Sequence, residues 1–275
     1  MNNTNKLNKK FALNQLLSMR KSHYFFLILL IQTPPVCSQS FKVIPYAAYS
    51  GVRMNDVNRD IANRIGQLRN LVDQPLPNPE KFNGNYGWGI QGQYHLGENY
   101  FLHLDTYFYK EKIKSEYYQQ LQPNSVNFLF ERQIQYFEAS FGLKYYLDYN
   151  TWKRLNFYLG GGVGIGFGWT DANTKYNDTI NTINNSGQYS STALVTYFLA
   201  GAEIRLSPYF SFFPEAGYRL ANLRQMNGRV SIYQDFPGYP DSSLEATNVD
   251  DTLEQIYDFS GFFISIGIGF IIPSL

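Results

Sequence analysis

Apolar side chains alternate with glycine or polar side chains over most of the chain after residue 40. Successive side chains of a strand point to opposite faces, so an alternation with period two predicts β-strands. The pattern is clearest over 155–170 and 257–272, where one face is large and apolar and the other is nearly bare. In the first of these segments the apolar face holds Leu155, Phe157, Leu159, Val163, Ile165, Phe167 and Trp169, and the bare face holds Gly160, Gly162, Gly164, Gly166 and Gly168.

Eight segments have this character, and the connections between them alternate in length. The predicted strands are 41–54, 86–96, 100–112, 132–147, 155–170, 192–206, 210–224 and 257–272. Short connections at 97–99, 148–154 and 207–209 alternate with long ones at 55–85, 113–131, 171–191 and 225–256. Each strand reaches the roughly 9 to 11 residues that a tilted strand needs to cross a bilayer. Short turns on one side and long loops on the other predict an all-β, eight-stranded antiparallel up-and-down barrel that spans the outer membrane, with both termini in the periplasm.

Charged residues of the predicted strands fall on the face opposite the apolar one. An ion that faces lipid costs a few kcal/mol, so these charges are expected to point into the lumen and to pair there. The predicted lumen charges are Asp105, Glu138, Lys144, Glu203, Arg205, Glu215 and Arg219, with Glu111 near them. The facing of the first strand stays open, because Pro45 interrupts its ladder and neither face is clearly apolar.

Aromatic residues near the strand ends are expected at the membrane interface, although ordinary strand packing would explain any single one of them. They are Tyr86, Trp88, Tyr94, Tyr145, Trp169 and Tyr257.

The N-terminus has the three regions of a secretory signal peptide. A basic stretch at 19–21 precedes an apolar stretch at 24–31, and small residues follow at 36–38, so we expect cleavage near Ser38 and a mature domain over 39–275. Residues 1–18 are interpreted as a possible upstream extension, because Met19 would also serve as the start. Cys37, the only cysteine, is interpreted as a small residue at the cleavage site rather than as a lipidation site.

Composition narrows the function classes. The 275 residues are 17% aromatic and 16% charged, and no apolar run approaches the roughly 18 residues of a spanning helix. The net charge is +1, and because the first 38 residues hold five basic residues and no acid, the remainder carries −4. A mildly acidic chain with scattered basic residues is not expected to bind nucleic acid.

The strand and loop pattern of 41–275 resembles that of the small outer-membrane barrels of the OmpA, OmpX and PorT-like type. Its last strand is similar to the family's assembly signal, which is formed here by Ser265, Gly267, Phe270 and Ile272, although three residues follow instead of a terminal aromatic. The resemblance implies a bacterial outer-membrane location, contact with membrane lipid and lipopolysaccharide, and insertion by the barrel assembly machinery. It implies little about the task of the protein.

Candidate sites other than the lumen charge network are few. His95 and His103, with Gln93 and Asp105, flank the first short turn on one face, and a polar lumen network explains them better than a metal site does. Neither a catalytic triad nor a cofactor motif is found, so we predict no enzyme, no cofactor and no metal.

Residues 57–72 have apolar positions at helical spacing, with Arg59, Arg64 and Arg69 between them. Such a helix would shield the rim of the barrel, or would touch lipopolysaccharide phosphates or a partner. Acids over 235–254 are interpreted as a solvated loop rather than a cation site.

Two functions remain open. The first is a structural or interaction protein that presents its outer loops for envelope integrity, adhesion or contact with an unknown extracellular or envelope protein. The second is a small pore for ions or small solutes. Because eight strands enclose an interior that side chains can fill, we favour the first.

Overall fold

The computed structural model describes residues 41–72, 75–120, 125–150, 154–178, 181–235 and 244–272. The predicted signal peptide and Cys37 lie outside these residues. The helix is α2 (Asn55–Val72), and the strands are β1 (Phe41–Ser50), β2 (Asn85–Gly97), β3 (Tyr100–Gln120), β4 (Ser125–Tyr146), β5 (Leu155–Asn177), β6 (Thr182–Arg205), β7 (Phe210–Leu223), β8 (Met226–Asp235), β9 (Leu244–Leu253), β10 (Tyr257–Asp258) and β11 (Gly261–Ile272).

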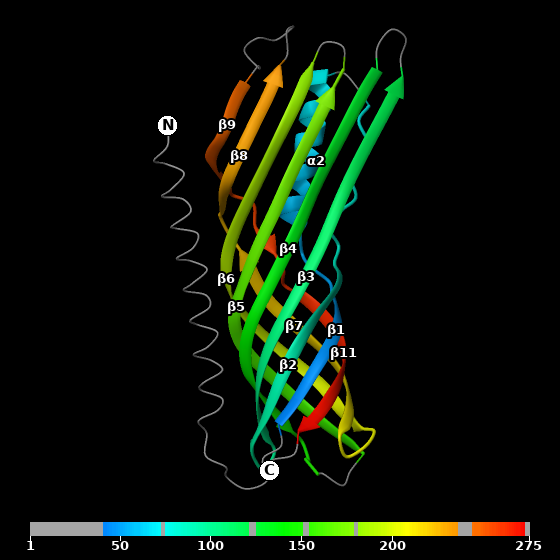
Figure 1. Cartoon of the computed structure of the whole chain (residues 1–275), viewed down its shortest axis with the longest axis vertical. Coiled ribbons are helices and arrows are strands. Elements are labelled where there is room, and N and C mark those ends of the chain that lie inside the picture. The colour runs from blue at the N-terminus through cyan, green and yellow to red at the C-terminus, as the bar shows by residue number, and fades with distance from the viewer. Residues whose placement is uncertain are drawn as a thin grey trace. The chain divides into compact units, whose positions relative to one another are not determined.

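Eight of these strands close into an antiparallel ring in the order β1-β2-β3-β4-β5-β6-β7-β11, and β11 pairs back with β1 (Figure 1). Phe41 at the start of β1 pairs with Ile272 at the end of β11, at the end of the ring that carries the short turns. Closure gives every ring strand a hydrogen-bonded neighbour on each side, which the interior of a bilayer requires. The predicted barrel is therefore confirmed. Within the described part of the chain, no helix is both long and apolar enough to cross a membrane.

The outer surface of the ring is apolar. Leu194, Phe198 and Phe262 are each at least 70% exposed, and the odd positions of β5 and the even positions of β11 form the same greasy surface. Such exposure is unfavourable in water and favourable against lipid chains. The facing of β1 is now settled, because its even positions point inward and Pro45 points outward.

Four strands run well beyond this apolar belt, so the prediction of long loops at 113–131 and 171–191 is wrong. β3 and β4 pair without interruption to Gln120 and Ser125, and β5 and β6 pair to Asn177 and Thr182. At the end of the belt the polarity of the two faces inverts. On β3, Lys110, Lys112 and Lys114 point outward while Tyr109 and Ile113 are buried inside. We call this part of the sheet the extension.

The last predicted loop, 225–256, is also mostly strand. β8 pairs with the outer part of β6, and β9 pairs with β8. The predicted last strand, 257–272, is interrupted: β10 pairs with β7 at Tyr257 and Asp258, and β11 begins at Gly261. The predicted first strand ends at Ser50 rather than at residue 54.

Helix α2 covers the inner face of the extension, as Figure 1 shows beside the outer parts of β3 to β6. Asp56 in its first turn and Arg69 in its last turn suit the helix dipole. Its buried side chains Val57, Ile61 and Ile65 belong to one hydrophobic cluster with residues of β3, β4, β6, β8 and β9. The helix predicted from periodicity is therefore present, and it forms the core of the extension.

Candidate functional site

Three layers of buried charge fill the barrel lumen. Nearest the short turns, the Lys42 ammonium donates to the Glu203 carboxylate at 2.5 Å, and both side chains are fully buried. Ser211 donates to the other Glu203 oxygen at 3.0 Å, and Arg205 lies 3.7 Å from it. Aromatic rings surround the ammonium, with the Phe101 centroid 5.0 Å away. A cation this well enclosed requires its anion.

The middle layer is centred on Lys144. Its ammonium donates to Glu215 and, at 2.7 Å, to the Gln91 side-chain oxygen. Tyr158 donates to the same Glu215 oxygen at 2.7 Å, and the lysine lies 4.5 Å from the centroid of that tyrosine ring. Gln93 donates to Gln91 at 2.7 Å, so the layer is a hydrogen-bonded network rather than an isolated pair.

The outer layer joins Arg219 to Glu138. The guanidinium Nε lies 2.9 Å from Glu138, which also accepts the Tyr136 hydroxyl at 3.0 Å. The guanidinium carbon is 4.3 Å from the centroid of the Tyr107 ring. Asp105 accepts the Tyr46 hydroxyl at 2.8 Å.

All seven charged residues named from the sequence thus lie in the lumen, and six of them lie in ion pairs. Glu111 lies farther out, where it accepts the Tyr109 hydroxyl. Sequence reasoning missed Lys42, Gln91 and Tyr158. The first was missed because the facing of β1 was ambiguous, and the other two because neutral residues give no charge signal.

Glycines of the inner face make room for tyrosines from neighbouring strands. A Cβ at Gly162 would lie 2.5 Å from the Tyr197 hydroxyl oxygen, and one at Gly166 would lie 2.6 Å from that of Tyr136. Both distances are far below van der Waals contact, so a Cβ at either position would have to displace a tyrosine ring. The bare face of β5 therefore allows large rings to occupy the lumen.

Among the described residues, the outer layer of charges encloses little free space. In the outer layer, among residues that include Asp105, Glu138 and Arg219, the cavity measures about 10 Å³. That is about the space of a single water molecule. Beyond it, the hydrophobic cluster beneath α2 covers the mouth of the barrel.

The other candidate sites do not assemble. His103 is buried against the Tyr197 hydroxyl at 2.5 Å, whereas His95 stacks on Phe101 and contacts the Glu98 carbonyl oxygen, so the two histidines belong to separate contacts. Among the described residues, no three histidine, cysteine or acidic side chains are grouped as metal ligands. In the acidic segment 235–254, Asp250 pairs with Arg229, and Asp241 lies outside the described residues.

The arginines of α2 are largely engaged within the protein. Arg59 pairs with Asp56, Arg64 pairs with Asp60, and Arg69 donates to the Leu76 carbonyl and to Asn78. These contacts favour the interpretation that the helix shields the rim of the barrel, rather than the interpretation that it binds lipopolysaccharide.

The predicted interface aromatics divide. Tyr86, Trp88, Tyr145 and Trp169 are exposed on the outer surface, and Tyr94 is half-buried. Tyr257 is 0% exposed and belongs to the cluster under α2, so the interface prediction is wrong for this residue. It lies on the short strand β10, inside the sheet rather than at the lipid boundary. In the assembly signal, Ser265 is buried while Phe270 and Ile272 are exposed.

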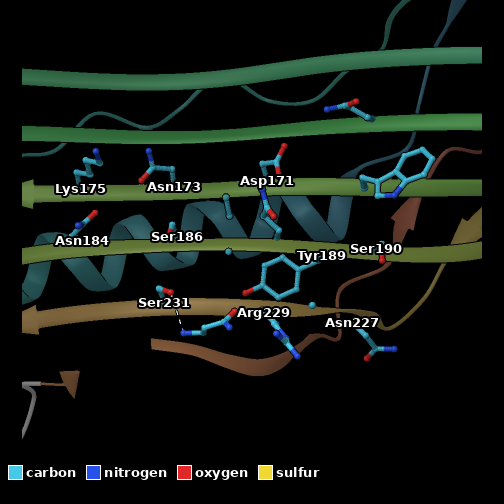
Figure 2. Close-up of a pocket in the computed structure, with 17 residues that line it drawn as sticks. Asp171, Asn173, Lys175, Asn184, Ser186, Tyr189, Ser190, Asn227, Arg229 and Ser231 are labelled. Carbon is cyan, nitrogen blue, oxygen red and sulfur yellow. Dashed lines mark hydrogen bonds between the residues drawn. The ribbon is translucent and has the colours of Figure 1, made fainter. Parts of the chain in front are cut away.

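The outward face of β5, β6 and β8 beyond the apolar belt forms an open hollow of about 1100 Å³. Figure 2 shows this face, with Asp171, Asn173 and Lys175 from β5, Asn184, Ser186 and Ser190 from β6, and Asn227, Arg229 and Ser231 from β8. Trp169, 43% exposed, stands at the end nearest the belt. Within the described part of the chain, the side chains of Asn184, Ser186, Gln188 and Ser190 form no hydrogen bond. We call this surface the polar face.

A closed antiparallel ring with an apolar exterior is the architecture of outer-membrane proteins. The chain is an eight-stranded β-barrel of the membrane-spanning kind. No family model matches it, and no curated protein sequence does. Among solved structures, it is similar to the attachment invasion locus protein of Yersinia pestis, at 12% identity over 86% of this chain and 100% of that one, with a TM-score of 0.40.

Two other structures illustrate the range of similar barrels. A major outer membrane protein from Thermus thermophilus matches at 12% identity over 85% of this chain and 99% of that one, with a TM-score of 0.44. The outer membrane protease OmpT from Escherichia coli matches at 10% identity over 88% and 99%, with a TM-score of 0.34.

Proposed function

We propose that this protein is a non-enzymatic, non-conducting barrel that serves as a structural or interaction protein of the cell envelope through its extracellular extension. The observation that carries the proposal is the filled lumen. Three layers of paired charges and the cluster beneath α2 stand where a solute path would run. A pore needs a continuous water column, and the small cavity of the outer layer does not supply one.

The extension supports the interaction part of the proposal. A plain barrel would end its strands near the lipid boundary, whereas β3 to β6 continue well past it and carry β8 and β9. Rigid, hydrogen-bonded strands present outward side chains at fixed spacing, which lowers the entropy cost of binding. The polar face offers amide, hydroxyl and charged groups whose hydrogen bonds a partner would complete (Figure 2).

A non-enzymatic role agrees with the state of the buried polar groups. The lumen carboxylates are held by lysine, arginine or tyrosine partners and are covered from solvent, so a substrate would have no access to them. Lipopolysaccharide and the barrel assembly machinery are proposed contacts of the outer surface and of β11, respectively.

Planar-bilayer recording of the purified protein tests the proposal against the pore. The expected result is no stable conductance in the parent. A variant that carries Lys144→Ala and Arg219→Ala removes the paired cations of the middle and outer layers, and its conductance shows whether the assay detects an opened lumen. Steady, size-selective conductance in the parent would refute the proposed interaction role and favour the pore.

A further inference from the structure

A second cavity lies on the inner side of the extension, between α2 and the strands that carry the polar face. It measures about 330 Å³, at the lower end of the roughly 300–1,000 Å³ range of small-molecule sites. In Figure 2 the helix is visible behind these strands. About half of its wall is apolar, and this part includes Ile65, Leu68, Phe130, Ile183, Ile232 and Leu253.

One cation in this wall lacks a hydrogen-bond partner. Arg132 of β4 is 3% exposed, and its Nε and Nη1 form no hydrogen bond within the described part of the chain. The carboxylate of Asp60 lies 3.9 Å from Nη1, beyond hydrogen-bond distance, and accepts from Arg64 at 2.8 Å instead. A buried guanidinium with unmet donors is costly, so this position favours an added anion.

The other charged groups of the wall are already engaged. Arg64 is paired with Asp60 as described, and Asp251 of β9 accepts the Tyr189 hydroxyl at 2.8 Å. Partial burial and this hydrogen bond to the carboxylate raise the pKa of Tyr189 above its ordinary value, so the hydroxyl remains a donor. Arg132 is therefore the one charged group of the cavity wall whose hydrogen-bonding needs are unmet among the described residues.

We propose that this cavity binds a small amphipathic anion, a molecule with one carboxylate on a compact apolar body. The carboxylate pairs with the guanidinium of Arg132, which lines the cavity, and the apolar body lies against Ile65, Phe130 and the neighbouring apolar side chains. Polar side chains of Gln67, Thr174 and Gln234 also line the cavity and suit a wet entrance from the extracellular side. The site is separate from the polar face, and its proposal does not depend on the interaction role.

The test compares two aromatic probes of the same shape, 2-naphthoate and the neutral 2-naphthamide, with the mature barrel in lipid nanodiscs. Equilibrium dialysis measures binding, and empty nanodiscs correct for partition into lipid. We expect saturable binding of the naphthoate and about tenfold or more weaker binding of the amide, because a hydrogen bond to a charged group is lost. Equal binding of the two probes, or no saturable binding of the naphthoate, would overturn the proposal.

Variants locate the site. Arg132→Met should remove the preference for the carboxylate, whereas Arg229→Met should leave it unchanged, because Arg229 is 59% exposed on the opposite face and pairs with Asp250. Val230→Phe, which narrows the cavity while keeping Arg132, should abolish naphthoate binding and remains informative if Arg132→Met does not fold. Parent-like binding in Val230→Phe would place the probe elsewhere and refute the site. Loss of the site would leave the conductance result, and with it the proposed function, unaffected.

Discussion

Replacing Lys144 by alanine tests whether the lumen is a packed interior or a water path. The ammonium group is 0% exposed, and it is the cation that pairs with Glu215. Its removal would leave that carboxylate, itself only 11% exposed, without a counter-charge. Breaking a buried pair by truncating one partner costs roughly 3 to 5 kcal/mol, so we expect the free energy of unfolding to fall by about that amount.

The matched control is Lys112→Ala in the extension. Lys112 pairs with Glu131 at 2.9 Å, but its side chain is 46% exposed. Exposed pairs contribute roughly 0.2 to 1 kcal/mol, so this loss should be small. Both variants are compared by urea unfolding in detergent micelles. If Lys144→Ala lost no more stability than Lys112→Ala, water would fill the lumen and the plugged-barrel reasoning would fail.

Three further substitutions probe other parts of the fold. Gly166→Ala should impair folding, seen as loss of the faster-migrating unheated band on gels, and Tyr136→Leu in the same chain should restore part of that band, because the two side chains compete for one space. Ile61→Ala should destabilise the extension by about 2 to 5 kcal/mol in urea unfolding yet produce no conductance, since the lumen stays filled. Phe270→Asp places an acid against lipid and should abolish recovery of the protein in outer-membrane fractions, whereas Tyr233→Asp in the extension should not. Normal recovery of Phe270→Asp would show that the Phe270 side chain does not face lipid.

The barrel could be predicted because lipid imposes a simple pattern on each spanning strand. Large apolar residues must face outward, as on β5 and β11, and charges must face inward. Helix α2 could also be predicted, because its apolar residues recur at helical spacing. It could not reveal which cation meets which anion, because the partners of Lys42 and Lys144 are 161 and 71 residues away along the chain.

The extension was missed for a physical reason. Beyond the belt the surroundings change from lipid to water, so the outward face of β3 becomes Lys110, Lys112 and Lys114, while Tyr109 and Ile113 turn inward against the cluster under α2. The period of two continues, but the face that carries the apolar residues is exchanged. A search for alternation alone, without a fixed apolar face, would have extended these strands.

Cysteine labelling in intact cells tests the central claim most directly, because it reports which outward positions meet water and which meet lipid. In a Cys37→Ser background, single cysteines replace Gln188 on the polar face, Leu194 farther down the same strand, and Tyr209 in the short turn after β6. A membrane-impermeant maleimide should label position 188 in intact cells, label position 209 only after the cells are broken, and leave position 194 unlabelled in both. Labelling of position 194 in intact cells, or failure to label position 188 there, would contradict an extracellular sheet that continues from a lipid-embedded barrel.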